Sequence, residues 1–156
     1  MATDDLIGSA NAQLKFTRRP SPILPEHRLI YKITQILLML YYSRAGKSSL
    51  LRLHLLNWAS KTQQRMQHLR IAVQKRSLSL PTWGFDPAVP IALRYAQAEG
   101  LIMQTSTGYQ LEEFGRKFIK NVLEDPSIFQ VEREGLMEIG KGITEGMVNS
   151  VARDWV

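Results

Sequence analysis

Apolar residues recur with the period of an α-helix along much of this chain. In residues 26–42 they stand at i, i+3, i+4 and i+7, which predicts a first long helix. The stretch "LLRLHLLNWAS", which starts at Leu50, predicts a second helix capped by the hydroxyl of Ser48 or Ser49. Residues 62–74 carry an apolar side of their own and predict a third helical segment.

The middle of the chain holds the clearest local signals. The stretch "DPAVPIALRYAQAEG" predicts a helix in which Asp86 is the N-cap, Pro87 takes the first helical position and Gly100 ends the helix. Two short apolar segments follow around Ser106-Thr107-Gly108 and predict a small β-hairpin. Residues 112–124 then predict one more helix with an apolar face.

The C-terminal stretch mixes a helical period with glycines. Its apolar residues have helical spacing, yet Gly135, Gly140, Gly142 and Gly146 interrupt them. A glycine inside a helix costs about 0.5–1 kcal/mol relative to alanine, so we expect this segment to pack on the domain or on another chain. The candidate partner-docking residues are Ile139, Ile143, Met147, Val151 and Trp155.

These patterns divide the chain into three parts. Residues 1–25 contain three prolines and little periodicity, which predicts an N-terminal arm. Residues 26–124 carry the helical and hairpin signals of one domain. Residues 125–156 form the predicted C-terminal helical docking segment.

Composition places the chain among ordinary globular proteins, with 44% hydrophobic and 22% charged residues. The absence of cysteine excludes disulfides and thiolate metal sites. The N-terminus lacks the basic and apolar regions of a signal peptide, and the longest apolar run, residues 36–42, is far short of the roughly 20 residues of a membrane helix. We therefore expect a cytoplasmic protein with no membrane partner.

The net charge of +6 is unevenly distributed. Residues 125–156 hold six acidic and three basic side chains, whereas residues 44–76 hold eight basic ones and no acidic one. Such a segment attracts phosphate groups or an acidic protein surface, although a solvated helix face is the simpler alternative. The candidate residues for binding DNA or an acidic partner are Arg44, Lys47, Arg52, Lys61, Arg65, Arg70, Lys75 and Arg76.

Gly46-Lys47-Ser48 has the ending of a nucleotide-binding P-loop. That motif needs another glycine five residues before Gly46, where this chain has Tyr41, and it needs a preceding strand, where this chain predicts a helix. We therefore interpret the segment as a turn between two helices, and we expect the chain itself to bind no nucleotide.

Candidate catalytic groups are sparse. The histidines His27, His54 and His68 have no spacing that brings two onto adjacent turns of one helix, which argues against a metal site. Ser48 and Ser49 stand outside any nucleophile-elbow context. We expect a protein that is not an enzyme, with no cofactor and no small-molecule substrate.

The segments "EGLI", from Glu99, and "GYQLEEFGRKFI", from Gly108, resemble the winged-helix family. The resemblance implies a mainly α-helical, winged helix-turn-helix-like domain with a small β-hairpin wing and extra terminal segments. Glu112 stands where the family usually has threonine or serine, so the hydroxyl cap of the last helix is missing. The helix that would enter the major groove offers only Arg94 and Gln97 as groove-reading residues, which predicts a poor reader of bases.

Over most of its length the chain resembles the small middle components of bacterial ABC-three-component systems, including Lamassu-type phage defence. The similarity lies in "GKSSLLRLHLLNWA" from Gly46, in the two winged-helix segments and in "IGKGITEG" from Ile139. It implies a non-catalytic subunit that bridges an SMC- or RecN-like ATPase and an effector and contacts duplex DNA non-specifically. The alternative is a dimeric winged-helix transcription regulator that binds DNA sequence-selectively.

Overall fold

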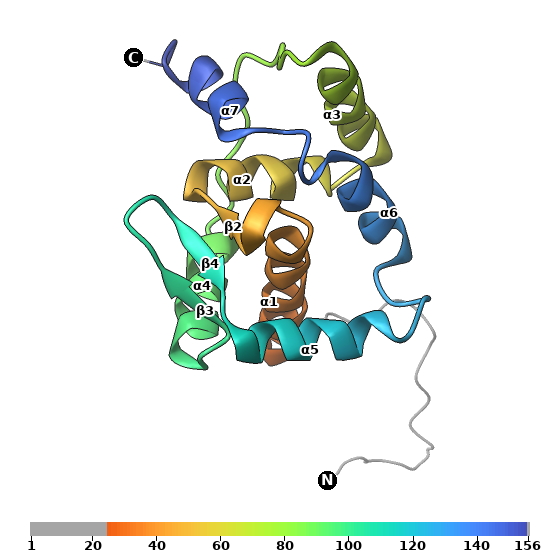
Figure 1. Ribbon diagram of the computed structural model, residues 1–156, viewed down its shortest axis with the longest axis vertical. Helices are drawn as coiled ribbons and strands as arrows, with labels where there is room; N and C mark the ends of the chain where they lie inside the picture. The colour runs from red at the N-terminus through yellow and green to blue at the C-terminus, as the bar shows by residue number, and fades with distance from the viewer. Residues whose placement is uncertain (1–24, 156) are drawn as a thin grey trace, which may run out of the picture.

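The computed structural model describes residues 25–155, and in that part of the chain helices pack together with a small antiparallel sheet at one side of the molecule (Figure 1). The predicted arm of residues 1–25 lies outside the described residues, except that Pro25 begins the first helix. The mainly helical class with a small hairpin is confirmed, and the layout is consistent with a winged-helix-like arrangement.

The elements follow the predicted order, with one added strand. In chain order they are α1 (Pro25–Tyr41), η1 (Arg44–Gly46), β2 (Lys47–Ser48), α2 (Leu50–Ala59), α3 (Gln63–Lys75), α4 (Ala88–Ala98), β3 (Ile102–Gln104), β4 (Tyr109–Leu111), α5 (Glu113–Leu123), α6 (Gln130–Ile139) and α7 (Glu145–Ala152). In the sheet, β4 lies between β2 and β3.

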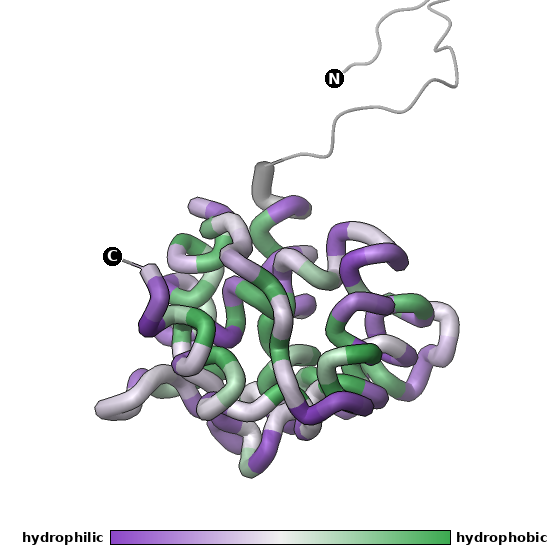
Figure 2. Tube along the Cα trace, turned by 90° about the horizontal axis from the view of Figure 1, so that it is seen from above, coloured by the Kyte–Doolittle hydropathy of each residue, from purple (hydrophilic) through white to green (hydrophobic). Residues whose placement is uncertain are grey.

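Helix α1 forms the centre of the molecule. Its residues 36–40 are at most 1% exposed, because α2, α4, α5 and α6 all contact it. The surrounding helices alternate hydrophobic and hydrophilic positions along the trace (Figure 2). Each therefore packs an apolar side on α1 or on a neighbour and leaves a polar side outward.

Hydroxyl caps fix where the next two helices begin. The Ser49 cap is one of the two predicted candidates, whereas the Thr62 cap is a finding of the structure. The Ser49 hydroxyl accepts a hydrogen bond from Arg52 N at 3.1 Å, which fixes the start of α2. Thr62 does the same for Arg65 N at the start of α3. Of the two serines proposed as the α2 cap, Ser49 is thus the one used.

The segment that resembles a P-loop is a turn that leads into an edge strand. Gly46 has φ +67°, a left-handed conformation that suits glycine, and it ends η1. Lys47 and Ser48 then pair with Gln110 and Tyr109 of β4. The interpretation as a turn after a helix is confirmed, but the short strand is an addition that periodicity cannot predict, because two residues have no period.

Residues around α4 and α5 follow the predicted pattern with a shift of boundary. Helix α4 begins at Ala88 with Pro87 in the N-cap position, so Asp86 lies one residue further out than predicted. Its carboxylate oxygen still accepts a hydrogen bond from Ala88 N at 2.9 Å. Gly100 ends the helix with φ +76°. Glu112 makes no side-chain cap for α5, as its missing hydroxyl predicts.

The C-terminal segment forms α6 and α7, which pack on the chain's own domain. Ile139, Ile143 and Val151 are buried in the common core, and Met147 packs against it. Trp155 stacks edge-on against Trp83, with 4.8 Å between ring centroids, and its indole N–H donates to the Pro81 carbonyl at 2.8 Å. These five side chains, predicted to dock on a partner, are used within this chain.

Candidate phosphate-binding groove

A groove in the described part of the chain has a volume of about 840 Å³. It lies where the turn η1 and strand β2 meet the β3–β4 hairpin and the segment that joins α6 to α7. Its charged and hydroxyl-bearing residues come from all of these elements. They are Arg44, Lys47, Ser48, Ser49, Arg52, Thr105, Thr107, Tyr109, Lys141, Thr144 and Glu145.

Three exposed cations surround the groove. Arg44 and Lys47 come from η1 and β2, and Lys141 comes from the segment after α6. Within residues 25–155 none of the three is in an ion pair. Cationic side chains combined with serine, threonine and tyrosine hydroxyls are the groups that proteins use to bind phosphate oxygens.

Arg52 lies at the base of the groove and is only 3% exposed. Its guanidinium donates to the Ser43 hydroxyl at 2.7 Å, to the Ile143 carbonyl at 2.7 Å and to the Gly140 carbonyl. Burial lowers the pKa of Arg52, and the negative charge of Glu145 opposes that shift. The prediction of Arg52 as a partner-binding cation is therefore corrected, because its donors are used to hold the base of the groove together.

Glu145 is the acidic residue among those that line the groove. Its carboxylate accepts hydrogen bonds from Ser49 N at 2.9 Å and from the Ser49 hydroxyl at 2.7 Å. This ties the start of α7 to the start of α2, where an anion is favoured by the unpaired backbone N–H groups. With three exposed cations against this one occupied carboxylate, the groove keeps a positive balance.

The other predicted cations do not join this groove. Lys61 pairs with Asp86 at 3.1 Å, and Arg70 pairs with Glu138 at 2.6 Å. Arg65 lies 5.0 Å from the centre of the Trp58 ring, a cation–π contact within α2 and α3. The remaining two, Lys75 and Arg76, are exposed at the end of α3 and line no part of the groove.

Lys141 is the groove cation that the sequence did not single out. It belongs to the acid-rich C-terminal segment, so a search for runs of like charge passes over it. Its place in the groove depends on the packing of residues 140–143 against the base of the groove through Arg52. That is a contact between residues far apart in the chain, for which the sequence offers no local signal.

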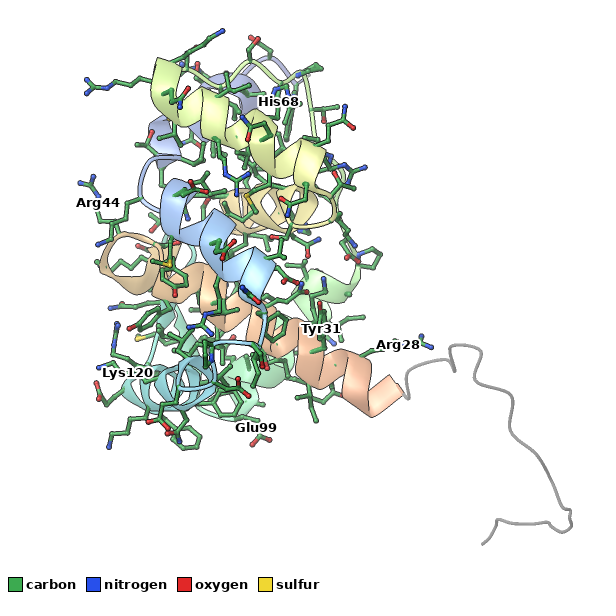
Figure 3. The ribbon with its side chains drawn as sticks, turned by 90° about the vertical axis from the view of Figure 1, so that its right-hand side faces the viewer. Arg28, Tyr31, Arg44, His68, Glu99 and Lys120 are labelled. Carbon is green, nitrogen blue, oxygen red and sulfur yellow. The ribbon has the colours of Figure 1, made fainter. Side chains whose placement is uncertain are left out.

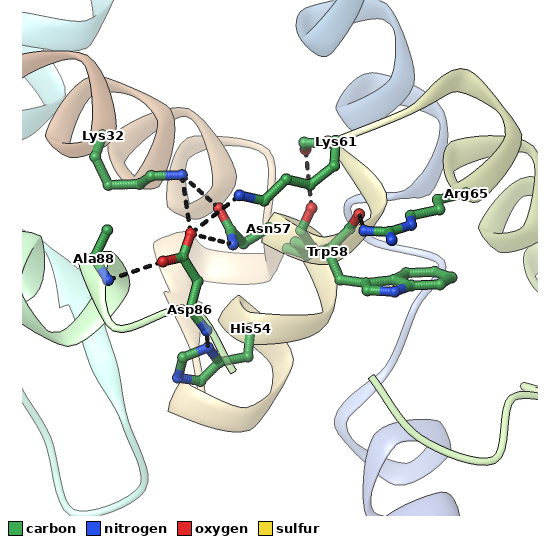
Figure 4. A network of polar contacts seen from close by, with 10 residues as sticks. Lys32, His54, Asn57, Trp58, Lys61, Arg65, Asp86 and Ala88 are labelled. Carbon is green, nitrogen blue, oxygen red and sulfur yellow. Dashed lines mark hydrogen bonds and ion pairs between the residues drawn. The ribbon is translucent and has the colours of Figure 1, made fainter. Parts of the chain in front are cut away.

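A second polar cluster joins α1, α2 and the start of α4 (Figure 4). Asp86 is its centre, with Lys32 Nζ at 3.8 Å, Lys61 Nζ at 3.1 Å and Asn57 Nδ2 at 3.3 Å. Burial acts to raise the pKa of Asp86, but hydrogen bonds from Ala88 N, Lys61 and Asn57 outweigh it and lower the pKa to about 2. The cluster is a saturated structural network around one carboxylate.

His54 lies beside this cluster. Its ring stacks on Phe85, with 4.4 Å between ring centroids, and its Nδ1 accepts from Asp86 N at 3.4 Å. Burial lowers the pKa of His54, whereas the Asp86 charge raises it. No group of three or more His, Asp or Glu side chains suited to a metal occurs within the described residues.

None of the helices in residues 25–155 is both long enough and apolar enough to cross a membrane.

Comparison of the chain with protein-family models, with curated proteins and with solved structures finds no match.

Proposed function

We propose that this chain is a non-catalytic subunit of a multi-protein anti-phage complex that contacts the phosphates of duplex DNA through the groove. Its winged-helix-like domain would bridge an SMC- or RecN-like ABC-type ATPase and an effector. The order of α1, β2, α2, α4, the β3–β4 hairpin and α5 supports the winged-helix-like assignment, with α3 as an insertion between α2 and α4.

The observation that carries the DNA contact is the chemistry of the groove. Arg44, Lys47 and Lys141 approach it from separate elements, and hydroxyl groups lie between them. Phosphate contacts of this kind supply most of the affinity in non-specific DNA binding and carry no sequence information. The groove therefore suits a subunit that is held on DNA of any sequence.

The exposed side of α4 argues against the alternative of a sequence-reading regulator. A recognition helix in the major groove reads bases mainly with Arg, Lys, Asn and Gln. Here Arg94 and Gln97 are exposed beside Ile91, which cannot form hydrogen bonds, and Tyr95, which is not among the usual readers of base edges. The pattern favours contact with a protein.

Binding to duplexes of unrelated sequence tests the DNA contact. We expect dissociation constants in the range of about 10⁻⁴ to 10⁻⁶ M at physiological salt, differing by less than about threefold between sequences. Selection from a pool of random duplexes provides the decisive comparison. A selected sequence bound about 1,000-fold more tightly than the pool average would instead identify a regulator.

Membership of a complex is tested by co-expression with the proteins encoded by neighbouring genes. We expect the chain to co-elute in fixed stoichiometry with a long coiled-coil ATPase. Elution as a separate, stable monomer beside such an ATPase would contradict the proposed subunit role.

A further inference from the structure

The first residue of α7, Glu145, places a negative charge inside the groove. The charged residues that line the groove are Arg44, Lys47, Arg52, Lys141 and Glu145, so the lining holds one anion and four cations. One oxygen of the Glu145 carboxylate accepts from Ser49 N at 2.9 Å, and the other accepts from the Ser49 hydroxyl at 2.7 Å. The carboxylate is therefore held against another lining residue of the groove, where a DNA phosphate would have to approach.

This contact occupies both hydrogen-bond donors of Ser49. A backbone N–H and a hydroxyl each carry a single hydrogen, and both hydrogens of Ser49 are donated to Glu145. Backbone N–H groups and serine hydroxyls are also donors that proteins use to bind nucleic-acid phosphates. The Glu145 carboxylate and a DNA phosphate are therefore alternative acceptors for the same two donors.

Glu145 can turn away from Ser49 while α7 stays in place. Its side chain is exposed and in no ion pair within residues 25–155, so water can replace both hydrogen bonds. Helix α7 has other anchors, because Val148 is fully buried and the Thr144 hydroxyl accepts from Met147 N at 3.1 Å. Rotation of one side chain is thus sufficient to free the donors of Ser49.

The charge of Glu145 opposes DNA as long as it stays on Ser49. Arg44, Lys47 and Lys141 attract the phosphates of a duplex, whereas a carboxylate among them repels the same phosphates. Turning Glu145 out to solvent removes this repulsion but gives up its two hydrogen bonds. Either way, the groove binds DNA more weakly than its cations alone would.

We propose that Glu145 is an internal competitor of the DNA phosphates. In the free chain its carboxylate occupies the donors of Ser49, and a phosphate that enters the groove displaces it. The inference rests on the DNA contact of the proposed function and adds a restraint built into the same groove.

The variant Glu145→Gln tests the competitor, because glutamine removes the charge and keeps an acceptor for Ser49. The matched control is Glu134→Gln, which removes the same charge from an exposed site on α6 that lines no part of the groove. Affinity for a labelled duplex is measured by fluorescence anisotropy at one salt concentration. Thermal unfolding verifies that each variant is folded, since the charge of Glu145 also favours the charged form of Arg52.

We expect Glu145→Gln to bind the duplex at least about threefold more tightly than the unchanged chain, because one nearby repulsive charge is gone. Glu134→Gln should change the affinity by less than about 1.5-fold, because a distant exposed charge is screened. A purely structural tie between Glu145 and Ser49 would lower stability when weakened without tightening DNA binding. An affinity of Glu145→Gln no higher than that of Glu134→Gln would overturn the proposal.

The backbone amide signal of Ser49, followed by NMR in the full chain labelled with ¹⁵N, reports the displacement itself. We expect this signal to move when the unchanged chain is saturated with duplex, because its acceptor changes from a carboxylate to a phosphate. The amide of Thr62, at the start of α3 and outside the groove, is the control and should keep its position. An unmoved Ser49 signal in the saturated complex would contradict displacement.

The same measurements separate this inference from the proposed function. Duplex binding by the unchanged chain, with an unmoved Ser49 signal and no gain in Glu145→Gln, would overturn the competitor and leave the DNA contact standing. Failure of both the unchanged chain and Glu145→Gln to bind any duplex would overturn the DNA contact, and the competitor with it.

Discussion

Arg44 and Arg52 lie eight residues apart in one basic segment, yet their surroundings are opposite. Arg44 is exposed beside the groove, whereas Arg52 is buried and donates to the hydroxyls of Ser43 and Ser48 and to carbonyls of residues 140–143. A buried cation whose hydrogen bonds are satisfied holds its neighbours in place and is not available to a partner.

Replacing Arg52 by alanine should lower the free energy of unfolding by about 3 kcal/mol, because several buried acceptors lose a charged donor. Urea denaturation at pH 7 measures this change. The matched control, Arg44→Ala, removes an exposed cation from the same segment and should change stability by no more than about 0.5 kcal/mol. Equal stability of the two variants would contradict the structural role of Arg52.

Asp86 gives stability a dependence on pH. Its pKa in the folded chain is about 2, below the ordinary value of 3.8, so the charged form is the one that folding favours. The resulting stability is complete above about pH 4 and is lost as the pH falls through about 2. Solvent screening at this partly exposed site leaves about 1–2 kcal/mol of the effect.

The comparison of Asp86→Asn with the unchanged chain isolates this effect, since asparagine can still accept the hydrogen bond from Ala88 N. The unchanged chain should be more stable by about 1–2 kcal/mol at pH 6, and the difference should vanish near pH 2. Urea denaturation across that range measures it. A difference that stays constant with pH would show that the Asp86 charge has no part in stability.

At the scale of elements, the glycines between α6 and α7 permit contacts that a larger residue would block. A Cβ atom on Gly140 would overlap the carbonyl oxygen of Tyr42, and one on Gly142 would lie 2.6 Å from Val73 Cγ1. Gly140 has an ordinary helical φ of −56°, so its requirement is one of space. The glycines that weaken this segment as a helix are what let it pack on α1 and α3.

Two alanine substitutions with opposite expected signs test this explanation. Gly140→Ala should destabilise the chain by about 1–3 kcal/mol, because backbone atoms must move apart. Gly146→Ala, in the first turn of α7 and with no atom closer than 3.8 Å, should stabilise it by about 0.5–1 kcal/mol. Thermal or urea unfolding distinguishes the signs. A Gly140→Ala variant as stable as the unchanged chain would mean that space is not the reason for this glycine.

Local signals predicted most of the elements, and contacts distant in sequence account for the rest. The Ser49 cap and the stop at Gly100 act within one helical turn, so the sequence around each was sufficient. Three features depend on contacts between residues many positions apart in the sequence. They are the pairing of β2 with β4, the burial of Arg52 and the position of Lys141 beside the groove. Neither hydrophobic periodicity nor a capping residue predicts such long-range contacts.

At the scale of the whole molecule, folding regroups the charges of the sequence. The basic segment of residues 44–76 is divided among the groove, intramolecular pairs and the end of α3. Lys141 belongs to the acid-rich segment of residues 125–156 and also lines the groove. The groove therefore combines cations from the basic segment and from the acid-rich segment.

The salt dependence of DNA binding tests the phosphate contact of the groove most directly. The affinity for a labelled duplex is measured by fluorescence anisotropy between 50 and 200 mM salt, roughly the interval over which counterion release dominates. The test variant is Arg44→Ala/Lys47→Ala/Lys141→Ala. The control is Arg28→Ala, because Arg28 is exposed at the opposite end of α1 from Arg44 (Figure 3).

Each lost phosphate contact lowers the slope of log affinity against log salt by about 0.9, so the triple variant should lose about 3 from the slope and bind weakly at all salts. Arg28→Ala should keep the slope of the unchanged chain within about 1. A triple variant with an unchanged slope, or an equal loss in Arg28→Ala, would contradict the groove as the site of phosphate contact.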